Sequence, residues 1–142
     1  VKLAGIKWGS FARKNSDNKY LTYYGDGVYG EAYSKLISES LIGLGLLSKW
    51  VPELHTTRTF EIPACGTALL TEANEETSRF FTNEEAIFYN SAGQITDLVK
   101  YYMFNNNELS AIAQKGRKRV LSSGYDYRSI VENILRKTSL YE

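Results

Sequence analysis

The chain has 142 residues, 43% of them hydrophobic and 23% charged, which is typical of a folded globular protein, and we expect one domain over residues 1–142. Its 17 basic and 16 acidic residues give a formal charge of +1, which does not favour a broad nucleic-acid or membrane footprint. One cysteine excludes a disulfide framework, one histidine excludes a multi-histidine metal site, and no apolar run is long enough for a membrane span.

Short apolar segments predict the strands. They cover, in chain order, residues 1–6, 20–24, 41–47, 67–71 and 86–89. The third of these is apolar at every position, as expected of a strand covered by helices on both faces. Between the first two strands, residues 9–19 are rich in Ser, Asn, Lys and Arg and predict a polar loop.

Helical periodicity is clearest in the second half of the chain. Before it, residues 30–38 predict a helix that buries Tyr33, Leu36 and Ile37. Ser91 and Gln94 match a capping box that opens the next helix, and Asp126 can cap the last one. The expected buried stripes are Ile95, Leu98, Val99, Tyr102 and Met103, then Leu109, Ile112, Ala113 and Val120, and finally Tyr127, Ile130, Val131, Ile134 and Leu135.

Strands that alternate with helices predict a parallel sheet in an α/β layer fold. In such sheets ligands bind beyond the carboxyl ends of the strands. Residues 53–67 lie at such a place, between the third and fourth predicted strands. They predict a helix over 57–64 with Thr56 or Thr57 at its N-cap, ended by Pro63 and by a left-handed cap at Gly66.

The start of this helix suits an anion, because free amides and the helix dipole meet there. A phosphate would also account for Arg58 in the first turn. Glu61, one turn further in, fits neutral hydroxyls of a sugar or, alternatively, a nearby Lys or Arg, and Glu53 could accept from a second set of hydroxyls. The residues therefore predict a site for a phosphorylated, hydroxyl-rich ligand.

A pair of glutamates eight positions apart, Glu53 and Glu61, is followed by Ile-Pro-Ala-Cys-Gly-Thr. This pattern resembles the C-terminal, donor-binding half of the group 1 GT-B glycosyltransferases. The stretch from Leu54 to Gly66 is similar to the spore-maturation-type glycosyltransferases in particular. The resemblance covers nearly all of residues 1–138, and Gly30-Glu-Ala-Tyr and Gly116-Arg-Lys-Arg-Val agree with it.

The resemblance implies a Rossmann-like, three-layer parallel sheet flanked by helices, which is the C-terminal half of a GT-B fold truncated at its N-terminus. It implies that Glu61 binds the ribose hydroxyls of a nucleotide. Glu53 would face the transferred sugar as the catalytic residue. His55, Thr56 and Thr57 would lie in the loop that contacts the sugar and the diphosphate.

The nucleotide base would lie near Gly25 and Val28. The resemblance implies that no metal and no cofactor is needed, the nucleoside diphosphate sugar being a substrate. It also implies a cytoplasmic enzyme that transfers a hexosyl group to an acceptor of unknown kind.

The chain starts at Val1, and its one methionine is Met103, which favours a piece of a longer protein. We therefore expect an N-terminal acceptor-binding domain as the missing partner, and an inactive isolated fragment. Two alternatives stay open, namely a non-catalytic nucleotide-binding or assembly module and one subunit of a split glycosyltransferase. Leu54-His55-Thr56 stands where the class usually has Gly-Phe-Gly.

Overall fold

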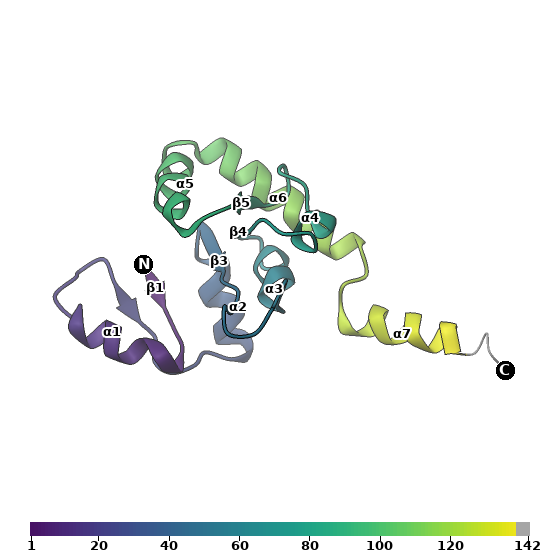
Figure 1. Ribbon diagram of the computed structural model, residues 1–142, viewed down its shortest axis with the longest axis horizontal. Coiled ribbons are helices and arrows are strands. Elements are labelled where there is room, and N and C mark those ends of the chain that lie inside the picture. Colours follow the sequence, from purple (N-terminus) through teal and green to yellow (C-terminus); the bar gives the residue numbers. More distant parts are fainter. Residues whose placement is uncertain (139–142) are drawn as a thin grey trace. The chain divides into compact units, whose positions relative to one another are not determined.

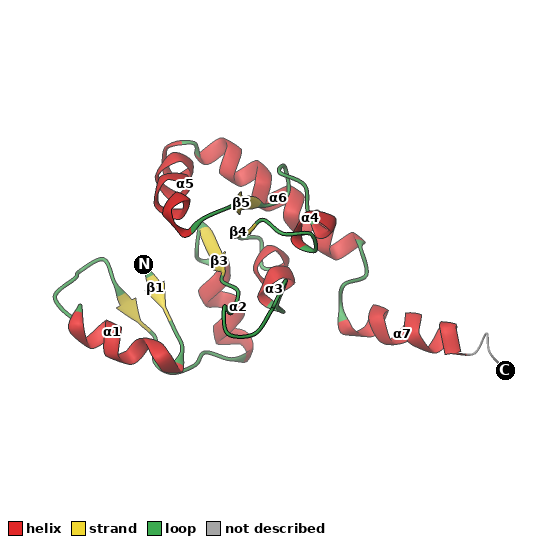
Figure 2. Cartoon of the chain, viewed as in Figure 1, coloured by secondary structure: helices red, strands yellow, loops and turns green. Residues whose placement is uncertain are grey.

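The computed structural model describes residues 1–138 and divides the chain into two compact units, one of Val1–Leu36 and one that begins at Ile37. Each unit has its own parallel sheet, and helices alternate with strands along the chain (Figure 1, Figure 2). This is the α/β class that the sequence predicts. That residues 1–142 form one domain stays a prediction.

The first unit contains a two-stranded parallel sheet and two short helical segments. Its elements are β1 (Lys2–Leu3), the 3-10 helix η1 (Ile6–Trp8), α1 (Gly9–Lys14), β2 (Thr22–Tyr23) and the start of α2 (Gly30–Ser38). The strand predicted over residues 1–6 is shorter because the backbone turns at Gly5, where φ is +131°. The Gly5 amide donates to the carbonyl oxygen of Gly25 at 3.0 Å, which joins the loops that follow the two strands.

The prediction of a polar loop over residues 9–19 is wrong for its first half, which forms α1. Trp8 and Phe11 lie three positions apart, and their rings meet edge to face with centroids 6.0 Å apart. The Asn15 side chain donates to the Phe11 carbonyl oxygen at 2.8 Å at the end of this helix. These local contacts stabilise a helical turn that the polar composition did not indicate.

The second unit is built on three parallel strands in the order β3 (Ile42–Gly45), β4 (Ala68–Glu72), β5 (Ile87–Tyr89). Leu44 pairs with Leu70, and Leu70 pairs with Ile87. These strands confirm the predicted segments 41–47, 67–71 and 86–89. The expectation that the first of them is covered on both faces is wrong at Leu44, whose side chain is 43% exposed.

The helices of the second unit are the end of α2, α3 (Arg58–Ala64), α4 (Thr77–Phe80), α5 (Ala92–Phe104), α6 (Asn106–Ser122) and α7 (Tyr127–Thr138). All but α4 are predicted by the sequence, but Met103, expected on the buried stripe of α5, is 58% exposed. The capping box predicted at the start of α5 is wrong for the described residues, because Ser91 contributes no side-chain cap and the Gln94 side chain accepts at 2.7 Å from the amide of Asn90, one residue before the N-cap. Within residues 1–138, no helix has the length and apolarity required to cross a membrane.

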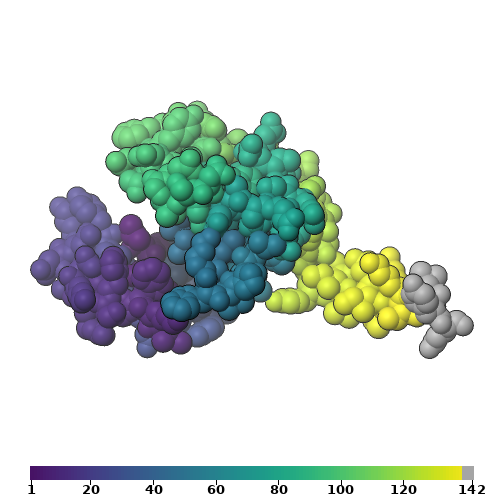
Figure 3. Space-filling model, viewed as in Figure 1, coloured from purple at the N-terminus to yellow at the C-terminus, as the bar shows by residue number. Residues whose placement is uncertain are grey.

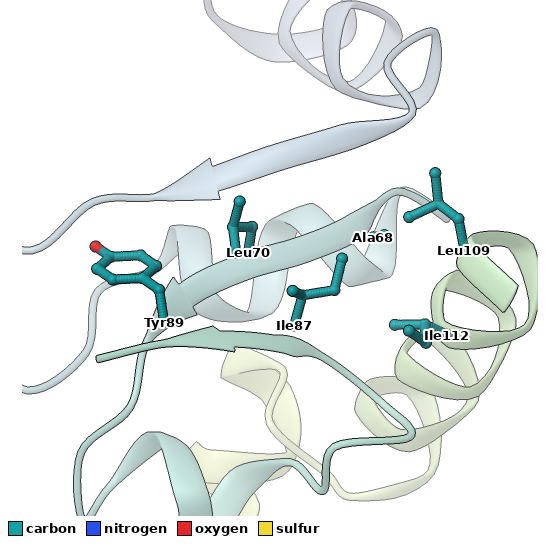
Figure 4. Close-up of a cluster of buried hydrophobic side chains, with 6 residues drawn as sticks. All are labelled: Ala68, Leu70, Ile87, Tyr89, Leu109 and Ile112. Carbon is teal, nitrogen blue, oxygen red and sulfur yellow. The ribbon is translucent and has the colours of Figure 1, made fainter. Parts of the chain in front are cut away.

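The core lies on both faces of the three-stranded sheet, because alternate side chains of β4 point to opposite faces. On one face, a buried cluster comes from β4, β5 and α6 and comprises Ala68, Leu70, Ile87, Tyr89, Leu109 and Ile112 (Figure 4). On the other face, the cluster comprises Ile62, Leu69, Phe81, Ala86 and Val120. Helix α6 contributes Leu109 and Ile112 to the first cluster and Val120 to the second, so it packs against both.

Helix α7 differs from its prediction in one respect. Asp126 caps it as expected, with Oδ1 accepting from the Ser129 amide at 2.9 Å. The apolar residues predicted to be buried are instead 43% to 77% exposed, and these are Tyr127, Ile130, Val131, Ile134 and Leu135. The side chains of this helix, yellow in Figure 3, are uncovered on the face shown. Periodicity reports the spacing of apolar residues, whereas burial needs a neighbouring surface.

Helix α3 packs closely on β3, and this contact places the segment that carries the candidate site. A Cβ atom on Gly43 would lie 2.6 Å from Cγ2 of Ile62, so only glycine allows this approach. At the other end of α3, Gly66 has the predicted left-handed conformation, with φ of +82°, and its amide donates to the Pro63 carbonyl oxygen at 2.9 Å.

Candidate functional site

The candidate site lies beyond the carboxyl ends of β3 and β4, which meet at one edge of the sheet because the strands are parallel. Residues 46–57 follow β3, and residues 73–76 follow β4. Glu53, His55, Thr56 and Thr57 belong to the first of these loops, and Arg58 and Glu61 to the helix α3 that follows it. The structure thus brings six of the predicted residues onto one loop and one helix.

Glu53 is exposed, and its carboxylate holds its own loop together. Oε2 accepts from the Ser48 amide at 3.1 Å, and the Glu53 amide donates to the Val51 carbonyl oxygen at 2.7 Å. The Ser48 hydroxyl oxygen in turn accepts from the amide of Trp50 at 3.2 Å. The loop is a compact turn that leaves Trp50 at the surface.

His55 is held by a charged partner and by aromatic rings. Its Nδ1 forms a very short contact with Oε2 of Glu76, which lies in the loop after β4. The ring meets Phe60 and Phe80 edge to face, with centroids 5.8 and 5.2 Å away. Tyr125 packs on Phe60 at 4.8 Å, so the histidine stands at the margin of an aromatic cluster.

The Asn74 side chain also connects the loop after β3 with the loop after β4, by hydrogen bonds to backbone groups of both. Its Nδ2 donates to the Leu54 carbonyl oxygen at 2.8 Å, and its Oδ1 accepts from the amides of Glu76 and Thr77 at 2.9 and 3.0 Å. The Thr77 hydroxyl donates to the carbonyl oxygen of Glu72 at 2.9 Å, at the end of β4. The loop that carries Glu53 and His55 is therefore anchored to the next strand of the sheet.

The start of α3 is organised by threonines, although differently from the prediction. Thr57 occupies the N-cap, but the described residues show no cap bond from its side chain. Instead the Thr56 amide donates to the hydroxyl oxygen of the fully buried Thr59 at 3.1 Å. The Thr56 hydroxyl is buried and has no hydrogen-bond partner within residues 1–138. Arg58 reaches back to the β3 side, and its Nη2 donates to the Leu46 carbonyl oxygen at 3.3 Å.

Glu61 is half-buried one turn into α3, where its amide donates to the Thr57 carbonyl oxygen at 2.9 Å. Burial, and then the Glu61 charge, raise the pKa of the Cys65 thiol, while Arg117 opposes the shift. Cys65 is therefore a protonated thiol at neutral pH, in keeping with packing and not with a role as nucleophile.

Gly25 and Val28 belong to the first unit, whereas the other six candidate residues belong to the second. Gly25 has a φ of +89°, and Val28 is half-buried. Next to them, the Tyr23 hydroxyl donates to Oδ1 of Asp26 at 2.7 Å. That bond raises the pKa of Tyr23 and stiffens the turn in which the nucleotide base is expected.

Sequence reasoning missed Asn74 and Glu76, which lie 20 and 21 positions after the loop residues that they bind. The available signal was their place directly after the carboxyl end of β4. Because parallel strands end at a shared edge, polar residues after one strand can meet those after its neighbour. No group of three or more acidic, histidine or cysteine side chains in residues 1–138 is arranged to hold a metal ion.

A parallel α/β sheet whose loops gather polar side chains at its carboxyl edge is typical of the open α/β folds to which the Rossmann-like class belongs. Solved structures share this fold. HepE from Anabaena, in complex with UDP-glucose, matches at a TM-score of 0.74 and 11% identity over 97% of this chain and 40% of that chain. Sucrose-phosphate synthase from Thermosynechococcus elongatus matches at 0.68 and 14% identity over 93% of this chain and 33% of that chain. This chain thus spans well under half the length of either protein.

The fold is that of a GT-B glycosyltransferase domain. Residues 1–136 match the profile of the glycosyl transferase-like family, and the chain belongs to that family. A comparison with curated proteins found no match.

Proposed function

We propose that this chain is the donor-binding domain of a glycosyltransferase that transfers a hexosyl group from a nucleoside diphosphate sugar to an acceptor. Membership of the glycosyl transferase-like family over residues 1–136 supports the reaction class. Structures of similar fold are complexes of HepE with UDP-glucose and with UDP, which supports a nucleotide sugar as ligand. The similarity of residues 54–66 to the spore-maturation-type enzymes supports that subfamily.

The observation that carries the proposal is the placement of the two glutamates. Glu53 lies in the loop beyond β3, and Glu61 lies one turn into the helix that follows, both beside the carboxyl edge of the sheet. In the proposed role, Glu61 accepts from the ribose hydroxyls, and Glu53 faces the transferred sugar. Both carboxylates are acceptors, and neighbouring hydroxyls of a sugar are matched donors.

The remaining site residues take the roles that the resemblance implies. His55, Thr56, Thr57 and Arg58 bind the sugar and the diphosphate, and the turn with Gly25 and Val28 binds the base. The reaction then needs no metal and no cofactor, because amides and cationic side chains stabilise the leaving diphosphate. The whole enzyme is cytoplasmic, and an N-terminal acceptor-binding domain completes it, so the isolated chain is inactive.

Calorimetric titration with UDP, GDP, ADP, CDP and dTDP tests the proposal. We expect one nucleotide to bind and Glu61→Ala to weaken it about 10- to 100-fold, the loss of hydrogen bonds to a charged group. Glu132→Ala, on α7, is the control and retains the wild-type affinity. Failure of all five nucleotides to bind a folded sample would contradict the proposal and favour a non-catalytic assembly module.

A further inference from the structure

The contact between His55 and Glu76 has a chemical consequence. The ring nitrogen that meets the Glu76 carboxylate is Nδ1. An ionised carboxylate can only accept a hydrogen bond, so Nδ1 must carry the proton. In the neutral imidazole this leaves Nε2 as the unprotonated nitrogen, which can accept a hydrogen bond. Glu76 therefore selects one of the two tautomers of the histidine.

Both members of the pair are mounted rigidly. The Glu76 amide donates to Oδ1 of Asn74 at 2.9 Å, which fixes the start of α4. The same asparagine holds the Leu54 carbonyl oxygen at 2.8 Å, one residue before His55. Phe60 and Phe80 meet the imidazole edge to face and restrict its rotation. Such a supporting shell is what keeps a binding group within a fraction of an ångström of its working position.

The pair is also within reach of a ligand, since the side chains of His55 and Glu76 are 41% and 33% exposed. His55 lies two positions after Glu53, in the loop beyond the carboxyl end of β3. The oxygens of an ionised diphosphate only accept hydrogen bonds, so they do not match an unprotonated Nε2. A sugar hydroxyl does match it, because a hydroxyl can donate.

We propose that Glu76 is a positioning residue that fixes His55 as the Nδ1–H tautomer, and that Nε2 of His55 accepts a hydrogen bond from a hydroxyl of the transferred sugar. The sugar contact rests on the proposed function, whereas the tautomer does not. Together with the exposed Glu53, this nitrogen gives the loop two acceptors, an arrangement suited to a ligand rich in hydroxyl donors.

The tautomer can be read directly by NMR, because His55 is the single histidine of the chain. In a ¹⁵N-labelled sample near pH 8, we expect the ring-nitrogen shifts of the Nδ1–H form. Glu76→Ala should shift the population toward Nε2–H, and Glu76→Gln should retain Nδ1–H because its amide oxygen still accepts. Glu75→Ala, whose carboxylate pairs with Arg79, is the matched control and should leave the ring unchanged. An Nε2–H ring in the wild type would overturn the proposal.

The sugar contact is tested by binding UDP and UDP-glucose to the same variants. We expect Glu76→Ala to weaken UDP-glucose about fivefold, the loss of one neutral hydrogen bond, and UDP less than twofold. UDP-glucose but not UDP should move the Nε2 resonance of the wild type. Equal weakening of both ligands would show a merely structural role and overturn the sugar contact. Binding of neither ligand would contradict the proposed function and the sugar contact, while the NMR measurement would still decide the tautomer.

Discussion

The side-chain amide of Asn74 bridges two loops, with Nδ2 donating to the Leu54 carbonyl oxygen at 2.8 Å and Oδ1 accepting from the amides that open α4. One residue thus serves as the cap of a helix and as the anchor of the loop that carries the candidate site. Its two functions use different atoms, so they can be separated by substitution.

We expect Asn74→Ala to lower the free energy of unfolding by about 1–3 kcal/mol, because it removes the cap and leaves the Leu54 carbonyl without its donor. Asn74→Asp keeps one oxygen that accepts from the two amides but replaces the Nδ2 donor with a second acceptor oxygen, so it should retain the cap and speed amide exchange at residues 54–56. Urea unfolding and hydrogen exchange measure the two effects. Equal stability of wild type and Asn74→Ala would show that the bridge contributes nothing.

Gly116, in the middle of α6, faces the carbonyl oxygen of Glu85. A Cβ atom at this position would lie 2.4 Å from that oxygen. Gly116→Ala should therefore destabilise the protein by about 1–3 kcal/mol, although alanine is the better helix former by about 1 kcal/mol. Gly93→Ala on α5 is the matched control, since its Cβ would lie 3.9 Å from Oγ of Ser91, and we expect it to be neutral or stabilising. A stabilising Gly116→Ala in urea unfolding would contradict this packing.

The cap of α7 predicts a dependence on pH. Hydrogen bonds from the hydroxyl and then the amide of Ser129 lower the pKa of Asp126 below its ordinary value. A lowered pKa in the folded state means that the cap contributes stability above the ordinary aspartate pKa of about 4 and loses it as the pH falls through the lower, folded value.

We therefore expect amide exchange at Ser129 to show increased opening of α7 below about pH 4, after correction for the intrinsic rate. Asp126→Asn keeps a capping oxygen without the titrating charge, so this acid-induced opening should disappear while the helix persists. The same acid response in Asp126→Asn would assign the effect to another group.

Two isoleucines that the sequence predicts on buried helix faces should differ in how much stability the protein loses when each is truncated to alanine. Ile112 on α6 is buried in the cluster of Figure 4, whereas Ile134 on α7 is 55% exposed. We expect Ile112→Ala to cost about 2–5 kcal/mol and Ile134→Ala less than about 0.5 kcal/mol. Thermal and urea unfolding compare them directly. A large loss from Ile134→Ala would show that α7 is covered in solution.

Much of the fold follows from the sequence, because the signals involved are local. Apolar spacing identified α2, α5 and α6 and the three strands of the second unit, and Gly66 marked the end of α3 through the conformation that glycine alone adopts readily. Helix α1 was missed because its local contacts, one pair of rings and one side-chain hydrogen bond from Asn15, do not form an apolar stripe.

The candidate site likewise has one part that the sequence predicts and another part that only the structure reveals. Glu53 and Glu61 lie in one continuous segment, so their spacing and the strand before them are enough to predict a ligand edge, which stays a prediction. The partners Asn74 and Glu76 come from a later strand, and only the parallel pairing of β3 with β4 brings them to that segment. The exposure of α7 is a tertiary property for the same reason: a sequence records the period of an apolar face, whereas the packing of distant elements decides whether another surface covers it.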